Sequence, residues 1–109
     1  MHELSIAQSV VTAVCERAGE RRVHGVRVRI GVLTAVVPDA MRFCFGLAGE
    51  GTVAEGARLT IEQRPGTVHC RACGAETDLP DPILLCPCGS ADVAVTGGRE
   101  LQIVSMEVG

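Results

Sequence analysis

Four of the chain's six cysteines lie in one stretch, residues 65–98, which also holds four of its five prolines. They form two pairs, Cys70 with Cys73 in "CRACG" and Cys86 with Cys88 in "CPCGS". Because the stretch is also interrupted by several glycines, it is not expected to bury a core of its own. A bound metal or a cross-link must therefore supply part of its folding free energy.

A single Zn²⁺ explains the two pairs best, because four thiolates complete a closed tetrahedral structural site. The glycine after Cys73 permits the tight reversal that directs backbone N–H groups toward the sulfurs. The second pair has only Pro87 between its cysteines, and this proline removes one donor, so the same knuckle is not expected there. The sequence predicts a four-cysteine zinc site that is distorted, labile, or completed by His69 in place of one thiolate.

Thiol redox chemistry is the alternative for these cysteines, since Cys-x-x-Cys also serves in thiol exchange. Redox motifs usually open a helix after a strand, whereas both pairs here lie in turns rich in proline and glycine. The other two cysteines, Cys15 and Cys44, fall inside predicted helices and are interpreted as small buried side chains. The metal interpretation is therefore favoured.

The rest of the sequence contains two helix patterns. Apolar residues recur at spacings of three and four from Glu3 to about Arg21, which predicts a helix. A second helix is predicted in "VVPDAMRFCFGLAGEGT", with Pro38 and Asp39 at its start. The side chains expected to be buried on the two helices are Leu4, Ala7, Val11, Val14, Ala18, Met41, Phe45, Leu47 and Ala48.

Three segments alternate with the period of two that is typical of half-buried strands. They are "VHGVRVRIGVL", "ARLTIEQR" and "ELQIVSMEV". In the first of them Val26, Val28 and Ile30 are expected to share the buried side. The predicted fold class is α+β: a small three-stranded sheet with two helices, plus an inserted zinc-ribbon-like module.

The position of the insert between two strands predicts a discontinuous domain. Residues 1–64 with 99–109 are expected to form an α/β domain, and residues 65–98 a zinc-binding domain.

The composition argues against several classes of function. The net charge of −3 and the aromatic content of 2% disfavour a protein that contacts nucleic-acid phosphates or stacks on bases. No nucleophile with a neighbouring base and no phosphate-binding loop is visible, so no enzyme is expected. A zinc-ribbon interaction module in transcription or other complexes stays an alternative, supported only by the basic residues Arg21, Arg22, Arg27 and Arg29, which are better interpreted as a solvated face.

The sequence also bears on where the protein acts. No apolar run approaches the about 18–20 residues needed to span a membrane. The first residues include Glu3 and lack the basic and then apolar pattern of a secretion signal. A cytoplasmic protein is expected, in which cysteines stay reduced and serve as metal ligands more often than as disulfides.

The first three residues, "MHE", offer a second metal-binding pattern. The Met1 amine, the His2 backbone nitrogen and His2 Nδ1 can form fused chelate rings, and a nitrogen of Glu3 completes four in a plane. Square-planar nitrogen coordination suits Ni²⁺ or Cu²⁺. A histidine near the start of a chain is also common without any function, so the pattern needs support from the rest of the sequence.

The segments "MHELSIAQSVV" and "GGRELQIVSMEV", together with the two cysteine pairs, resemble the HypA/HybF family of hydrogenase-maturation nickel metallochaperones. The resemblance covers essentially the whole chain, and its one departure is the Cys-Pro-Cys spacing. It implies that Met1, His2 and Glu3 bind nickel, which makes the α/β domain the nickel-binding one. It also implies that a structural zinc is held by Cys70, Cys73, Cys86 and Cys88.

The resemblance implies partners as well. Members of the family pass nickel, together with a HypB-type GTPase, to the large subunit of [NiFe]-hydrogenase, and in some organisms they also serve urease maturation. Neither a nucleic acid nor a membrane is expected as a partner, and a monomer and a weak homodimer fit equally. The sequence assigns no part in metal binding to His24 or Asp39, and to His69 only the alternative of completing the zinc site.

Overall fold

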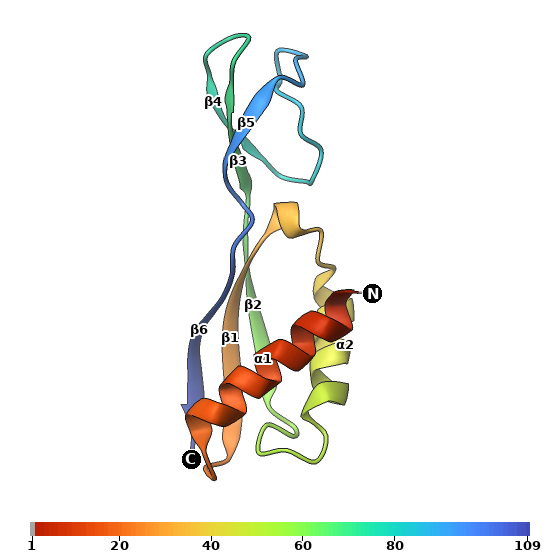
Figure 1. Cartoon of the computed structure of the whole chain (residues 1–109), viewed down its shortest axis with the longest axis vertical. Helices are drawn as coiled ribbons and strands as arrows, with labels where there is room; N and C mark the ends of the chain where they lie inside the picture. Colours follow the sequence, from red (N-terminus) through yellow and green to blue (C-terminus); the bar gives the residue numbers. More distant parts are fainter. Residues whose placement is uncertain (1) are drawn as a thin grey trace. The chain divides into compact units, whose positions relative to one another are not determined.

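The computed structural model describes residues 2–109 and divides into two compact units (Figure 1). The helical unit comprises residues 2–29, 36–62 and 102–109, and the cysteine unit comprises residues 30–35 and 63–101.

The predicted domains differ from these units mainly at residues 30–35, which group with the cysteine unit. The predicted division at residues 64/65 and 98/99 lies within a few residues of the other junctions. The assignment of these two regions as a nickel-binding and a zinc-binding domain stays a prediction.

The first helix, α1, spans His2–Ala18. Its buried face consists of Ala7, Val10, Val11, Val14 and Ala18, at the helical spacing that the sequence indicates. The expectation that Leu4 belongs to this face is wrong, because Leu4 is 41% exposed. Glu3 takes the inward position in the first turn instead, with its side chain only 13% exposed.

The strand β1, Val23–Gly31, is the central strand of a sheet with the order β2-β1-β6, in which β2 is Arg58–Arg64 and β6 is Leu101–Val108. The predicted alternation is confirmed, since Val26, Val28 and Ile30 are at most 3% exposed. All three predicted strands are present. With the two predicted helices, α1 and the one described below, they confirm the α+β class.

The predicted strand continues past Gly31 in sequence, but β1 ends there and a 3-10 helix, η1 (Val32–Thr34), follows. The Leu33 N–H donates to the Gly98 carbonyl (2.9 Å), and Ala35 has a positive φ of 60°. These features turn the chain out of the strand direction before the next helix.

The second helix, α2, spans Pro38–Gly49 and packs against α1. Met41, Phe45 and Gly49 form its buried face, with Met41 0% and Phe45 2% exposed. Leu47 was expected on this face and is 46% exposed, so that expectation is wrong. The reason is the spacing of four between the buried positions, which places residue 47 on another side of the helix.

The cysteine unit contains a second sheet that the sequence pattern did not indicate. Its strands are β3 (Gly66–Cys70), β4 (Glu76–Leu79) and β5 (Val93–Gly97), in the antiparallel order β4-β3-β5. Strands of four or five residues carry too little alternation to be recognised among prolines and glycines. Apart from two cysteines, the buried apolar side chains of this unit are Ile30, Val68 and Leu79.

Within residues 2–109, no helix combines the length and the hydropathy that a membrane span requires.

The burial pattern of α2 predicts unequal effects of two neighbouring substitutions. Phe45→Ala removes a ring that is 2% exposed and should lower the free energy of unfolding by about 3–5 kcal/mol. Leu47→Ala, the matched control at a position 46% exposed, should cost less than about 1 kcal/mol. Urea unfolding followed by circular dichroism measures both, and equal losses would contradict the assignment of the buried face.

Candidate metal centre

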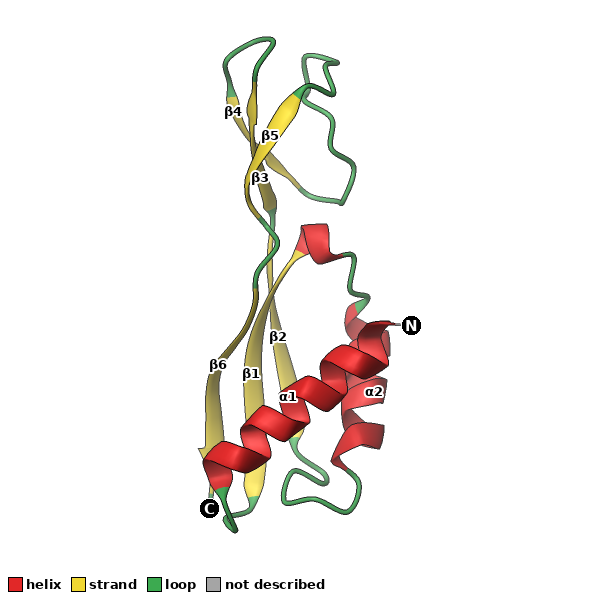
Figure 2. Ribbon diagram, viewed as in Figure 1, coloured by secondary structure: helices red, strands yellow, loops and turns green. Residues whose placement is uncertain are grey.

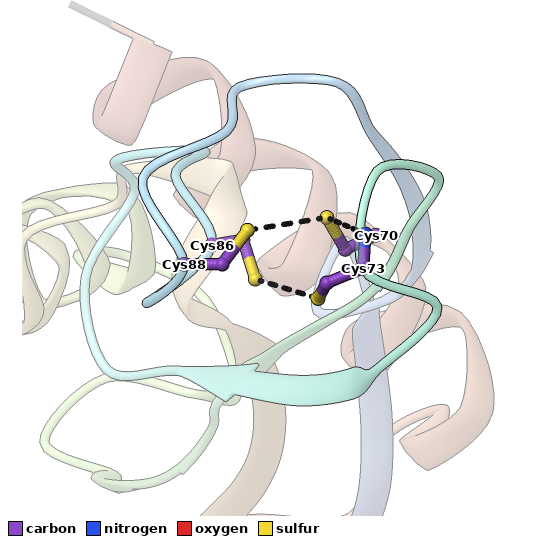
Figure 3. A group of neighbouring side chains, drawn as sticks. All are labelled: Cys70, Cys73, Cys86 and Cys88. Carbon is purple, nitrogen blue, oxygen red and sulfur yellow. Dashed lines mark hydrogen bonds between the residues drawn. The ribbon is translucent and has the colours of Figure 1, made fainter.

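The four cysteine sulfurs of the cysteine unit lie together (Figure 3). The Sγ atoms of Cys70 and Cys88 are 3.7 Å apart, those of Cys73 and Cys86 are also 3.7 Å apart, and all four lie within 4.8 Å of one another. Each close contact joins one cysteine of the first pair to one of the second. The fold thus brings together the two pairs that were noted in the sequence.

The turn after β3 positions the first pair. The Gly74 N–H donates to the Cys70 carbonyl (2.8 Å), and the Cys70 N–H donates to the Ala75 carbonyl (2.9 Å). Gly74 has a φ of +79°, a conformation that glycine adopts without steric cost. The turn also directs the Cys73 N–H at Cys70 Sγ (3.5 Å).

The second pair lies in a turn closed in the same way. The Gly89 N–H donates to the Cys86 carbonyl (2.8 Å), and the Cys86 N–H donates to the Ser90 carbonyl (2.9 Å). In both turns the glycine directly after the second cysteine closes the loop, although the two knuckles are not identical, as the sequence predicts. The turn is one residue shorter, and Pro87 does not interrupt it because neither closing donor is the N–H at that position.

The sulfur geometry fits a tetrahedral zinc site. With Zn–S bonds of about 2.3 Å, the edge of a regular tetrahedron is about 3.8 Å. The two close sulfur–sulfur distances of 3.7 Å agree with that edge. Cys70 and Cys86 are buried whereas Cys73 and Cys88 are exposed, so each turn contributes one inward and one outward ligand.

The thiols of this cluster hold their protons unequally. The Cys73 N–H lowers the pKa of the Cys70 thiol to about 6, against the effect of burial, and the Ala72 N–H and the neighbouring thiols lower it further. At neutral pH Cys70 is therefore a thiolate.

Two of the other thiols keep their protons. The Ala75 N–H lowers the pKa of Cys73, but hydrogen bonds with the Cys70 and Cys86 thiols, together with burial, raise this pKa above its usual value. The Ser90 N–H likewise lowers the pKa of Cys88, but the neighbouring thiols and burial raise it to about 12. A thiolate among protonated thiols is a group that a divalent cation can bind by displacing protons.

His69 is not part of the sulfur cluster. It lies in β3 opposite Glu76 of β4, and its Nδ1 pairs with the Glu76 carboxylate. Among residues 2–109, the four cysteines are the one group of three or more His, Cys, Asp or Glu ligand atoms gathered closely enough to hold a metal. The alternative in which His69 replaces a thiolate is therefore not the observed arrangement.

The surroundings of the cysteines differ from those of a redox motif. Loops without a helix connect β3 to β4 and β4 to β5 (Figure 2), so neither pair opens a helix. Cys15 and Cys44 lie on α1 and α2 and are half-buried, rather than buried as expected.

The N-terminal pattern lies at the start of α1. Met1 falls outside the described residues, and His2 has a side chain that is 51% exposed. The Glu3 carboxylate lies 3.9 Å from His2 Nε2 and accepts the Val37 N–H (3.1 Å). This N–H is the main cause of a lowered pKa at Glu3.

The contact between Glu3 and Val37 was missed in the sequence, although a signal for it exists. Val37 precedes Pro38 and Asp39 at a predicted helix start, yet it has no side chain able to cap a helix. In a capping box the N-cap N–H is accepted by a Glu or Gln at the third helical position, which here is Ala40, so an acceptor from elsewhere in the chain was to be expected. Two further residues had no assigned part in metal binding. His24 is exposed, and Asp39 forms an ion pair with Arg42 (3.1 Å).

Comparison with known proteins gives a consistent result over the whole chain. Residues 1–108 match the family described as "Hydrogenase/urease nickel incorporation, metallochaperone, hypA". A hydrogenase maturation factor HypA from Geobacter metallireducens is 47% identical over 110 residues, which cover 99% of each chain. The HypA of Nostoc sp. strain PCC 7120 is 45% identical over 108 residues, covering 99% of this chain and 96% of the relative.

Two solved structures share the fold. The solution structure of the Ni metallochaperone HypA from Helicobacter pylori has a TM-score of 0.63 at 22% identity, covering 99% of this chain and 97% of the other. A solution structure of HypA protein has a TM-score of 0.64 at 24% identity, covering 99% and 96%. With a family match along residues 1–108 and relatives of about 45% identity at nearly full length, the chain belongs to the HypA family of hydrogenase and urease nickel-incorporation metallochaperones.

Proposed function

We propose that this protein binds one Ni²⁺ at its N-terminus and delivers it for the maturation of [NiFe]-hydrogenase, while a structural Zn²⁺ is held by the four clustered cysteines. The observation that carries the proposal is membership of a family described by nickel incorporation. Delivery of a metal needs no catalytic group, so we propose that the protein is not an enzyme.

The nickel site in this proposal uses nitrogen donors of the first three residues, Met1, His2 and Glu3. The exposed imidazole of His2 supports it, because a carrier must offer its cargo to an acceptor. Nitrogen donors in a plane suit Ni²⁺ better than Zn²⁺, which prefers a tetrahedron. An exposed site of this kind can lose its ion by stepwise exchange of ligands.

The zinc site in this proposal uses Cys70, Cys73, Cys86 and Cys88, whose sulfur spacing fits the metal. Bound there, zinc would cross-link two turns that few apolar contacts hold. Four thiolates leave no open coordination position, so the ion would be structural. Reduced thiolates are the rule in the cytoplasm, which is the location that we propose.

The proposed partners follow from the family. We propose a HypB-type GTPase and the large subunit of [NiFe]-hydrogenase as the proteins that this chain contacts. Urease maturation is a further client, in line with the family description, which names both enzymes.

The nickel site can be tested by moving the terminal amine. Two extra residues before Met1 leave every side chain in place but remove the amine from the chelate. We expect tag-free protein to bind one Ni²⁺, and the extended form to bind it at least about tenfold more weakly, since a ligand is lost. Competition with a chromophoric chelator measures both affinities.

A pair of histidine variants controls this experiment. His2→Ala should weaken nickel binding as the extension does, whereas His24→Ala, at an exposed position outside the site, should not. Equal nickel affinity of the native and extended forms would refute a terminal chelate.

The zinc site predicts a steep dependence on pH. Cys73 and Cys88, with raised pKa values, hold protons near neutral pH, whereas Cys70, with a pKa of about 6, does not. Zinc must displace at least the two protons of Cys73 and Cys88, so its affinity should rise at least about a hundredfold between pH 6.5 and 7.5. Calorimetry in buffers of different ionisation enthalpy counts the released protons.

The matched controls are two cysteine substitutions. Cys88→Ala should weaken zinc binding and Cys15→Ala should leave it unchanged, because Cys15 lies on α1 outside the cluster. Zinc-loaded protein should also resist alkylation at the clustered thiols. An affinity independent of pH, with thiols that alkylate freely, would instead favour a redox pair.

A further inference from the structure

The start of α2 lacks a cap from its own sequence. Its N-cap residue, Val37, has extended backbone angles (φ −87°, ψ 117°) and a hydrocarbon side chain that cannot accept a hydrogen bond. The first helical bond runs from the Met41 N–H to the Val37 carbonyl (2.9 Å). In a capping box, a Glu or Gln three residues after the N-cap accepts the N-cap N–H. Here that position is Ala40, which has no acceptor.

Glu3 supplies the missing acceptor from the other helix. Its Oε2 accepts the Val37 N–H at 3.1 Å, in the way that a glutamate of α2 would in a capping box. The side chain of Glu3 is 13% exposed, whereas that of the preceding His2 is 51% exposed. Residue 3 is therefore tied to the beginning of α2, while residue 2 faces solvent. Figure 1 shows both helices beginning at the same end of the pair.

This tie lies within the proposed nickel site. His2 and Glu3 are in the first turn of α1, whose N–H groups have no acceptor within the helix. The proposed ligand nitrogens of residues 2 and 3 thus belong to the short segment that the Glu3 carboxylate fixes in place. A chelate closes with less loss of conformational entropy when its ligands are already held.

We propose that Glu3 is a positioning residue of the nickel site, whose carboxylate anchors the chelating segment by capping α2 at Val37 and does not itself bind the metal. This inference rests on the proposed function, since it assigns a part within the same site. In this proposal the backbone of residues 2 and 3 and the imidazole bind the ion. The Glu3 carboxylate, 3.9 Å from His2 Nε2, holds this segment to the Val37 N–H.

The test measures nickel affinity in variants of both partners of the hydrogen bond. The protein is the full chain, tag-free with its native Met1 and loaded with zinc, and the probe is Ni²⁺ alone. Glu3→Ala removes the acceptor, and Val37→Pro removes the donor without touching the terminal segment. The controls are Glu3→Gln, which keeps an acceptor, and Val37→Ala, which keeps the N–H at a side chain that is 55% exposed.

We expect Glu3→Ala and Val37→Pro each to raise the nickel Kd about tenfold and to speed nickel loss to a chelator, which is the usual cost of losing a group that orients a ligand. The double variant should be no weaker than either single one, because both changes break the same bond. Glu3→Gln and Val37→Ala should stay within about threefold of the native protein. The absorption band of square-planar Ni²⁺ should keep its position in every variant, because no ligand is lost.

The outcomes separate the two proposals. If the native protein binds nickel and Glu3→Ala and Val37→Pro bind it equally well, the anchoring inference is wrong and the proposed function stands. If Glu3→Gln loses as much affinity as Glu3→Ala and shifts the band, the carboxylate is a ligand and the inference is also wrong. If the native protein does not bind nickel, both fail. Should Val37→Pro not fold, as judged by circular dichroism, the glutamate pair alone decides.

Discussion

Two main-chain hydrogen bonds, from Gly74 to the Cys70 carbonyl and from Gly89 to the Cys86 carbonyl, determine where the four sulfurs lie. Each closes a turn that presents two cysteines, and the turns face each other with sulfurs 3.7 Å apart. The stability of the cysteine unit depends on this sulfur cluster. Its few buried apolar side chains offset only a small part of the entropy lost when the chain is ordered. A cation between the sulfurs would supply a large part of the remainder, since metal binding and folding are then one process.

The helical unit is held by a different force. Val26 and Val28 on β1 and the inward faces of the two helices are almost completely buried, and Phe45 is the one aromatic side chain in this core. Removal of apolar surface from water is the main favourable contribution to such an arrangement. Its metal-binding pattern can therefore lie at a helix end, exposed to solvent, without being needed for the fold. In the proposed function a resident metal and a transferred metal make opposite demands, and the two proposed sites lie in separate units.

The parts of the fold that repeat a regular pattern could be predicted from the sequence. The alternation around Val28 and the helical spacing around Val14 each extend over several residues, so one wrong position does not change the element. Single positions at the margins were less certain: Leu4 and Leu47 are apolar but lie exposed. The short strands of the cysteine unit were missed because hydrogen bonding across the sheet, which the sequence does not display, defines them more than side-chain alternation does.

In the candidate sites, too, features formed by residues close in sequence could be predicted, whereas contacts between residues far apart in sequence could not. Cysteine spacing marks the sulfur cluster because each pair is local, but it did not reveal that the Cys-Pro-Cys turn closes through Gly89 just as the longer turn closes through Gly74. The contact between Glu3 and Val37 joins residues that are 34 positions apart, and only the missing cap of α2 pointed to it. A carboxylate that accepts a backbone N–H from another helix can anchor the segment that carries it. In the proposed nickel site, the exposed imidazole can then release its ion to a partner while residue 3 keeps its place.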